Sequence, residues 1–259
     1  MLETNTNHFA VIVEYDGSNY HGFQIQKTEP TIQAAIETAL YKLTGEHIRI
    51  RSASRTDAGA HAYGQVVDFR TPKYYEEITL LKALNYYLPK DISIKKAYYV
   101  PNDFHSRKSA TSREYKYQIN NSDSKLALHR NYYAWVKHDL DIPSMNLACQ
   151  SLYGEHDFKN IAKSSYPGGS TTRTIYEWKV VASPTGVDIK CESNGFLKYQ
   201  IRKINGILVE IGKHQTPIST LSALLSTQLT TDNHYSMLPA CGLFLVGVKY
   251  GNPFSYIGE

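Results

Sequence analysis

The sequence predicts an α+β (α/β mixed) protein built as two ferredoxin-like, RRM-like halves, whose antiparallel sheets flank a central cleft. Its 259 residues are enough for two packed halves with a sizeable core. Segments with strand or helix periodicity follow the order strand, helix, strand, strand, helix, strand, and a similar order then returns with additions. We therefore expect an N-terminal half, 1–107, and a C-terminal half, 108–259.

The first half shows each of the six expected elements. Alternating apolar and polar residues favour a strand at 9–15, which ends in an Asp16-Gly17 turn signal. Thr31 is a suitable N-cap for a helix with an apolar stripe, and Gly45 is its natural C-cap. The remaining expected elements are strands at 48–52, 65–70 and 92–100 and a helix at 77–87.

The second half repeats this order with additional segments. We expect strands at 112–120, 172–182, 186–192 and 243–250, and helices at 143–153, 197–213 and 219–226. The Ser/Gly-rich stretch 164–170 reads as a flexible loop. Gly206 lies inside a helix, which indicates that another backbone approaches it closely.

Composition favours a reduced, cytoplasmic protein. No apolar stretch reaches the length of a membrane helix, and the N-terminus lacks the blocks of a signal peptide. The three cysteines are few and far apart, which argues against a disulfide framework or a zinc knuckle. Because the net charge is only +4, nucleic-acid binding requires basic residues to be concentrated on one face. The 21 tyrosines can fill a core or stack on RNA bases.

A polar loop between two expected strands holds the most informative carboxylate, Asp57. Arg55 precedes it by two residues, and Ala58, Gly59 and Ala60 follow it. These small residues allow a sharp turn and leave the carboxylate accessible to a bulky partner. Taken alone, such an aspartate more often closes an Asx turn than reacts.

Ten short motifs in chain order resemble the TruA-type tRNA pseudouridine synthases. They are Tyr15-Asp16-Gly17-Ser18, Gly22-Phe23-Gln24, Arg55-Thr56-Asp57-Ala58-Gly59-Ala60-His61-Ala62, Asn85 with Leu88-Pro89, Phe104-His105-Ser106-Arg107, Arg113-Glu114-Tyr115-Lys116-Tyr117, Gly154-Glu155-His156-Asp157-Phe158, Thr172-Arg173-Thr174-Ile175, Phe196-Leu197 with Ile201-Arg202, and Pro239-Ala240 with Gly242-Leu243. The resemblance covers nearly the whole chain. The family usually has Gly, Val and Trp where this chain has Ser54, Ala60 and Phe23, and Ser54 is unfavourable if the loop needs a positive φ there.

The resemblance implies an isomerase that detaches uracil from its ribose, rotates it and rejoins it through carbon. In the family the substrate is a uridine in the anticodon arm of tRNA, no cofactor or metal is needed, and the enzyme is a homodimer. The corresponding fold is the pseudouridine synthase fold.

The resemblance also assigns roles to individual residues. Asp57 matches the nucleophile, and a carboxylate can attack or stabilise a reacting sugar; whether it attacks the sugar or the base is open. Tyr115 matches the active-site tyrosine, which can stack on the base and help to remove a proton. Arg202 matches an arginine expected to pair with Asp57. Arg55 matches the residue that enters the RNA helix when the base is extruded.

Basic residues in and beside the fifth and sixth of these motifs, from Phe104 to Tyr117, indicate a phosphate-binding surface. Arg107 and Arg113 are the expected substrate contacts, together with Tyr115 and Arg55. Further cations that can line the same cleft are Lys108, Lys116, Lys198 and Lys203.

Two other functions are compatible with the residues. A metal-dependent phosphohydrolase could use His156 and Asp157 with His61 or His105, although metal sites need three or four ligands at set spacings. An RNA-binding module without catalysis could be built on the same two halves. Formation of pseudouridine in unmodified tRNA separates all three.

Overall fold

The computed structural model describes residues 6–162, 168–226 and 235–258. The chain forms two compact units: unit 1 comprises 1–113 and 244–259, and unit 2 comprises 114–243. The chain therefore enters unit 2 within one strand and returns to unit 1 within the last one. The division into the halves 1–107 and 108–259 remains a prediction. Most of the flexible loop expected at 164–170, namely 164–167, falls outside the described residues.

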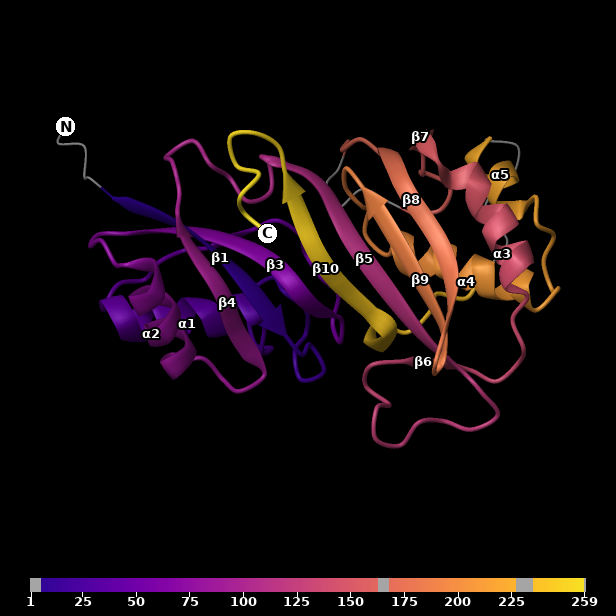
Figure 1. Ribbon diagram of the computed structural model, residues 1–259, viewed down its shortest axis with the longest axis horizontal. Coiled ribbons are helices and arrows are strands. Elements are labelled where there is room, and N and C mark those ends of the chain that lie inside the picture. Colours follow the sequence, from indigo (N-terminus) through magenta and orange to yellow (C-terminus); the bar gives the residue numbers. More distant parts are fainter. Residues whose placement is uncertain (1–5, 163–167, 227–234, 259) are drawn as a thin grey trace. The chain divides into compact units, whose positions relative to one another are not determined.

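Unit 1 confirms the order expected for the first half. Its elements are β1 (Asn7–Tyr15), α1 (Ile32–Thr44), β2 (Arg51–Ser52), β3 (His61–Thr71), α2 (Glu77–Tyr87) and β4 (Ile92–Tyr99), joined by most of β10 (Leu243–Tyr250) and the start of β5 (Ala110–Asn121). The strand order is β4-β1-β3-β10, and β2 pairs with β3. Helices α1 and α2 lie together against this sheet (Figure 1).

Strand β1, which lies between β3 and β4, is buried along most of its length and forms the middle of unit 1. Val11 of β1 is opposite Val67 of β3 and Ala97 of β4, in antiparallel register. Ile36 of α1 and Leu84 of α2 are fully buried. As expected, the Thr31 hydroxyl accepts a hydrogen bond from the N–H of Ala34 (3.3 Å), and Gly45 ends α1 with a φ of 78°.

Unit 2 contains the other elements. They are the rest of β5, β6 (Ala134–Val136), α3 (Ile142–Cys149), the 3₁₀ turn η1 (Gln150–Leu152), β7 (Gly154–Asp157), β8 (Thr172–Ser183), β9 (Gly186–Ser193), α4 (Gln200–Gly212), α5 (Thr220–Leu225) and the 3₁₀ turn η2 (Ala240–Gly242). The strand order is β5-β9-β8-β7, and β6 pairs with β5. Helices α3, α4 and α5 pack on one another, as Figure 1 shows.

The fold class predicted from the sequence, a mixed α/β protein, is confirmed. Parallel pairs nevertheless occur where antiparallel sheets were expected: β10 runs parallel to β3, and β6 runs parallel to β5. Neither pair is joined by a hairpin, so the chain direction is not restricted to antiparallel. In the described part of the chain, no helix is both long and apolar enough to cross a membrane.

Candidate active site

The loop that carries Asp57 connects β2 to β3 in unit 1. Arg55 and Ala58 are exposed, and Asp57 is half-buried. The N–H of Ala60 donates to the main-chain oxygen of Asp57 (3.1 Å), which closes a tight turn after the aspartate. The turn therefore leaves Asp57 at the surface of unit 1, as the small residues predicted.

The end of β1 and the segment that follows it form hydrogen bonds with this loop. The Tyr15 hydroxyl lies 2.8 Å from the Thr56 hydroxyl. The N–H of Phe23 donates to the Thr56 oxygen (3.1 Å), and the N–H of Gly59 donates to the Tyr20 oxygen (3.2 Å). Burial raises the pKa of Tyr15 to about 12, so its hydroxyl stays protonated at neutral pH and can donate. The residues on both sides of Asp57 are thus fixed by hydrogen bonds.

Two glycines make the close approach of these segments possible. A Cβ at Gly17 would lie 1.9 Å from the oxygen of Ala60. Gly22 has a φ of 90°, and a Cβ there would lie 2.8 Å from the oxygen of Thr56. A side chain at either position would displace the backbone of the Asp57 loop.

His61 fixes the other end of the loop. Its ring is buried, the N–H of Gly17 lies 3.1 Å from its Nδ1, and an oxygen of Asp16 lies at 3.1 Å from the same atom. The ring also stacks on Phe244, with centroids 4.7 Å apart. These contacts show a role for His61 in building the loop.

Ser54 adopts no positive φ, so the exchange of the family's usual glycine introduces no backbone strain there. The side-chain amide of Gln65 binds both main-chain groups of Ser54: its oxygen accepts from the N–H (3.2 Å), and its nitrogen donates to the carbonyl (2.8 Å).

The two predicted phosphate contacts in unit 1 differ in exposure. Arg107 is exposed, whereas Arg113 is only 6% exposed. The Arg113 guanidinium donates to the main-chain oxygens of Ala53, Arg107 and Ala110. The structure therefore brings Arg107 and Arg113 together with the start of the Asp57 loop.

Tyr115 lies in unit 2, in the middle of β5. It is 3% exposed, and its ring meets Phe196 edge-on at 5.4 Å between centroids. Phe196 in turn contacts Trp178 at 6.2 Å. The ring is thus held by aromatic neighbours.

Arg202 lies in the first turn of α4, also in unit 2. Its Nε donates to the oxygen of Leu238 (2.7 Å), and the N–H of Leu238 donates to the Arg202 oxygen (3.2 Å). Its guanidinium lies 5.7 Å from the ring centre of Tyr199, which begins α4 with a φ of 65°. Two segments of unit 2 therefore orient this side chain.

The pairing of Asp57 with Arg202 remains a prediction, because the two residues belong to different units.

Among the other cations, Lys198 is exposed and lies 4.7 Å from the Tyr199 ring centre, and Lys116 and Lys203 are half-buried.

The alternative metal site is divided between the units. His156 and Asp157 belong to unit 2, whereas His61 and His105 belong to unit 1. An oxygen of Asp157 accepts hydrogen bonds from the Thr171 hydroxyl (2.5 Å) and from the N–H of Lys159 (3.0 Å). Within 6–162, 168–226 and 235–258, no group of three or more His, Cys, Asp or Glu residues could hold a metal ion.

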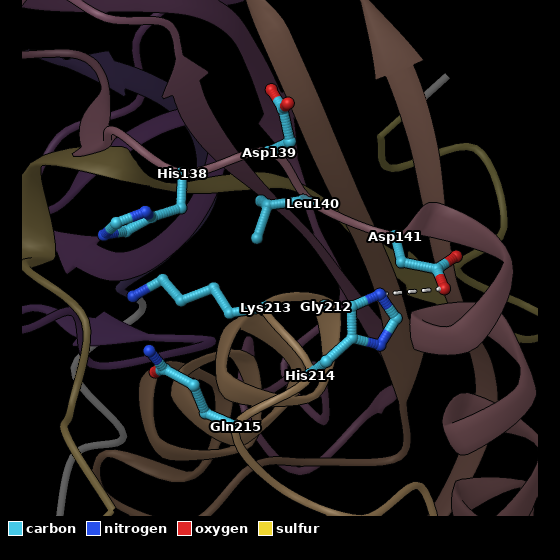
Figure 2. Close-up of a pocket in the computed structure, with 8 residues that line it drawn as sticks. All are labelled: His138, Asp139, Leu140, Asp141, Gly212, Lys213, His214 and Gln215. Carbon is cyan, nitrogen blue, oxygen red and sulfur yellow. Dashed lines mark ion pairs between the residues drawn. The ribbon is translucent and has the colours of Figure 1, made fainter.

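A cavity of about 450 Å³ in unit 2 contains none of the predicted site residues (Figure 2). Its lining consists of His138, Asp139, Leu140, Asp141, Gly212, Lys213, His214 and Gln215. Asp141 is the N-cap of α3: its carboxylate accepts from the N–H (3.1 Å) and the hydroxyl (2.6 Å) of Ser144, and it lies 3.5 Å from His214. These contacts join the start of α3 to the end of α4.

Sequence reasoning missed a buried charge cluster at Asp68 in unit 1. The Asp68 carboxylate is fully buried and binds His8 (2.9 Å), the Nε of Arg51 (2.8 Å) and the N–H of Ser106 (2.9 Å). An aspartate inside the otherwise apolar run from Val66 to Phe69 was the available signal, because a buried carboxylate requires charged or hydrogen-bonded partners.

Comparisons with known proteins identify the family. The sequence model of a family described as tRNA pseudouridine synthase matches residues 11–107 and 148–251. A tRNA pseudouridine synthase A of Pseudoalteromonas atlantica is 37% identical over 246 residues, which cover 95% of this chain and 93% of that protein. The protein of the same name from Ruminiclostridium cellulolyticum is 38% identical over 239 residues, covering 92% and 97%. That of Limosilactobacillus reuteri is 35% identical over 248 residues, covering 94% and 96%.

These matches show that the protein is an isomerase that acts on nucleic acid. The chain belongs to the tRNA pseudouridine synthase family, as its motifs indicated.

Proposed function

We propose that this chain converts uridine to pseudouridine in the anticodon arm of tRNA, with Asp57 as the nucleophile. Family membership supports the isomerisation of uridine in tRNA. The geometry of the Asp57 loop supports the role of the aspartate: the backbone on both sides is fixed by hydrogen bonds, and Asp57 is only half-buried. A preorganised and accessible carboxylate is what attack on an extruded nucleotide requires.

The reaction divides into steps that these residues can perform. The target uridine leaves its stack, at a cost of a few kcal/mol. Arg55, which is exposed two residues before Asp57, fills the space that the base leaves. Asp57 then supports cleavage of the glycosidic bond, and the detached uracil rotates and bonds again through carbon. Loss of the C5 proton restores the aromatic base and completes the isomerisation.

Tyr115 and Arg202 provide the remaining functions in this proposal. The Tyr115 ring stacks on the base, and its hydroxyl assists removal of the C5 proton. Arg202 holds the Asp57 carboxylate ionised through a bidentate pair, for which the planar guanidinium is suited. The chemistry uses no cofactor or metal in this scheme. We further propose that the enzyme works in the cytoplasm as a homodimer on tRNA.

Replacement of Asp57 by asparagine tests the nucleophile. Asp57→Asn keeps the shape of the side chain but removes its charge, so pseudouridine formation should be abolished while tRNA affinity stays within about three-fold. Pseudouridine is measured in unmodified tRNA, and affinity by filter binding. The control is Asp123→Asn, because Asp123 is exposed in a loop of unit 2. Substantial turnover by Asp57→Asn would exclude Asp57 as the nucleophile.

Tyr115→Phe tests the proton step separately. The variant keeps the ring and its contact with Phe196 but loses the hydroxyl. Single-turnover product formation should fall by a factor of about 10² or more, the usual contribution of a general base, while tRNA remains bound. An unchanged rate would show that the hydroxyl takes no part in the chemistry.

A further inference from the structure

In unit 1, the main-chain groups of Ser106 and Arg107 are bound by side chains. The N–H of Ser106 donates to Oδ1 of Asp68 (2.9 Å), and its carbonyl accepts from the Tyr250 hydroxyl (2.7 Å). The N–H of Arg107 donates to Nδ1 of His105 (3.2 Å). The carbonyl of Arg107 accepts from Nη2 of Arg113 (2.5 Å). Both N–H groups and both carbonyls of Ser106 and Arg107 are therefore bound by side chains.

Three of the four side chains that bind this segment come from strands and are buried, whereas His105 adjoins the segment in the chain and is half-buried. Asp68 belongs to β3, Tyr250 to β10 and Arg113 to β5, and each is at most 6% exposed. Strands are rigid supports, so the backbone of Ser106 and Arg107 is held in one conformation although it forms no regular structure.

Asp68 is itself held in place by Arg51 and His8. Its Oδ2 accepts hydrogen bonds from Arg51 and lies 2.9 Å from Nε2 of His8. Burial acts to raise the pKa of Asp68, but the hydrogen bonds from His8, Arg51 and Ser106 outweigh it and bring the pKa to about 2. The carboxylate therefore remains charged at neutral pH and accepts from the N–H of Ser106.

The outer side of the segment is exposed and basic. Arg107 and Lys108 are exposed, and the Arg51 side chain is 42% exposed. Burial lowers the pKa of His105, and the positive charges of Arg51 and Lys108 lower it further. His105 is therefore neutral near pH 7, as its acceptor role toward the N–H of Arg107 requires.

We propose that Ser106–Arg107 is a preorganised phosphate-binding segment for the tRNA backbone, and that Asp68, Tyr250 and Arg113 are its positioning residues. The inference rests on the proposed function in tRNA and deepens it. A guanidinium can bind a phosphate bidentately, and because the backbone that carries it is already fixed, no backbone entropy is lost on binding. For Arg113, this assigns a positioning role in place of the direct tRNA contact expected from the sequence. Because Arg113 also binds the carbonyl of Ala53, it links the segment to the start of the Asp57 loop.

A double-mutant cycle between Tyr250 and Arg107 tests the proposal. Tyr250→Phe removes only the hydroxyl that donates to Ser106, and its ring can keep its contact with Phe104. Loss of one buried hydrogen bond corresponds to about a three- to ten-fold effect. We expect Tyr250→Phe to weaken tRNA binding by about that factor, with kcat at saturating tRNA unchanged within two-fold. In the Arg107→Ala background, the same change should have no further effect on affinity.

The matched control is Tyr117→Phe, which removes an equivalent hydroxyl bond, 2.6 Å long, to the carbonyl of Pro239 in unit 2. It should show no coupling to Arg107. Equal effects of Tyr250→Phe with and without Arg107, or no effect at all, would overturn the proposal. If Tyr250→Phe unfolds below the assay temperature, the affinities are measured at a lower temperature at which all four proteins of the cycle are folded, and they are read by the same criterion.

The cycle is independent of the chemistry at Asp57. All affinities are measured by equilibrium binding to unmodified tRNA, so coupling between Tyr250 and Arg107 can be found even if Asp57→Asn retains activity. That result would reject the proposed nucleophile and keep the phosphate-binding segment. An inactive Asp57→Asn together with additive effects at Tyr250 and Arg107 would keep the proposed nucleophile and reject the phosphate-binding segment.

Discussion

At the scale of single residues, Asp68 shows how a buried charge can stabilise a segment without regular structure. Its carboxylate is fully buried, yet it has strong partners in His8, Arg51 and the N–H of Ser106. Removing one partner of such a cluster leaves an uncompensated charge, which usually costs more than the cluster contributes when it is complete. The value of Asp68 therefore lies in the conformation that it fixes.

The pKa of Asp68 predicts how stability depends on acid. The folded-state pKa is about 2, below the ordinary value of 3.8, so the ionised form stabilises the folded state above pH 3.8. This contribution is lost as the pH falls from about 4 to about 2, and it amounts to on the order of 2 kcal/mol. The measurement is the free energy of unfolding by urea across this range.

Asp68→Asn is the control for this pH dependence. The variant should be less stable than the unmodified protein above about pH 4, and it should lack the part of the acid-induced loss that comes from Asp68. Asp141 and Asp157 also have lowered pKa values, so only the difference between the two proteins is informative. Parallel losses in the two proteins would contradict the assignment.

At the scale of elements, the local sequence predicted what depends on local physics. The helix after Thr31 begins and ends where its capping residues indicated, and the expected strand and helix order of unit 1 is present. The sequence could not predict β6 and β7 because they are short strands defined by their partners, β5 and β8. Likewise, β10 joins β3 through pairing over a long sequence separation.

Helix α4 begins three residues later than periodicity predicted. Tyr199 adopts a left-handed conformation, and the side chain of Gln200 accepts from the N–H of Leu197 (2.8 Å), so 197–199 form a turn before the helix. A bulky residue with positive φ is rare, and periodicity contains no signal for it. The turn places Tyr199 beside Arg202.

The motif residues of the candidate site were predictable, but the residues that support them were less so. Tyr15 and Gly17 lie in recognised motifs, and the structure gives their physical reason: one bonds Thr56, and the other admits the backbone of Ala60. Asp68 and Tyr250 lie outside the motifs. Their partners are distant in sequence, and only the folded chain brings them to Ser106.

Gly206 provides a test at this scale. Its expected close backbone contact is confirmed, because a Cβ there would lie 1.9 Å from the carbonyl oxygen of Ser236. Gly206→Ala must displace the segment from Ser236 to Leu238, which binds Arg202. We expect a loss of stability of about 2–4 kcal/mol and reduced activity. The control is Gly247→Ala, since a Cβ at Gly247 meets no atom within 4 Å. Equal melting temperatures for the two variants would contradict this explanation.

At the scale of the whole molecule, charge distribution matters more than net charge. A net charge of +4 among 28 basic and 24 acidic residues is too small to attract tRNA if it is spread evenly. We expect the cations in and beside the motif loops to bind tRNA: Arg55, Arg107 and Lys108 are exposed in unit 1, and Lys198 is exposed in unit 2. Each phosphate that such a cation neutralises releases counterions, and this makes affinity depend on salt.

The salt dependence of tRNA binding follows from this distribution. If these four cations each contact a phosphate, the plot of log affinity against log salt concentration should have a slope of about −3. Arg107→Ala should reduce the magnitude of the slope by about one contact, or roughly 0.7–0.9. Replacing a basic residue outside this set, Lys42→Ala in the exposed last turn of α1, should leave the slope unchanged. Binding is measured between about 50 and 200 mM salt, where a protein with several phosphate contacts loses affinity steeply. A slope weaker than about −1 for the unmodified protein would show that tRNA is recognised mainly through contacts other than these cations.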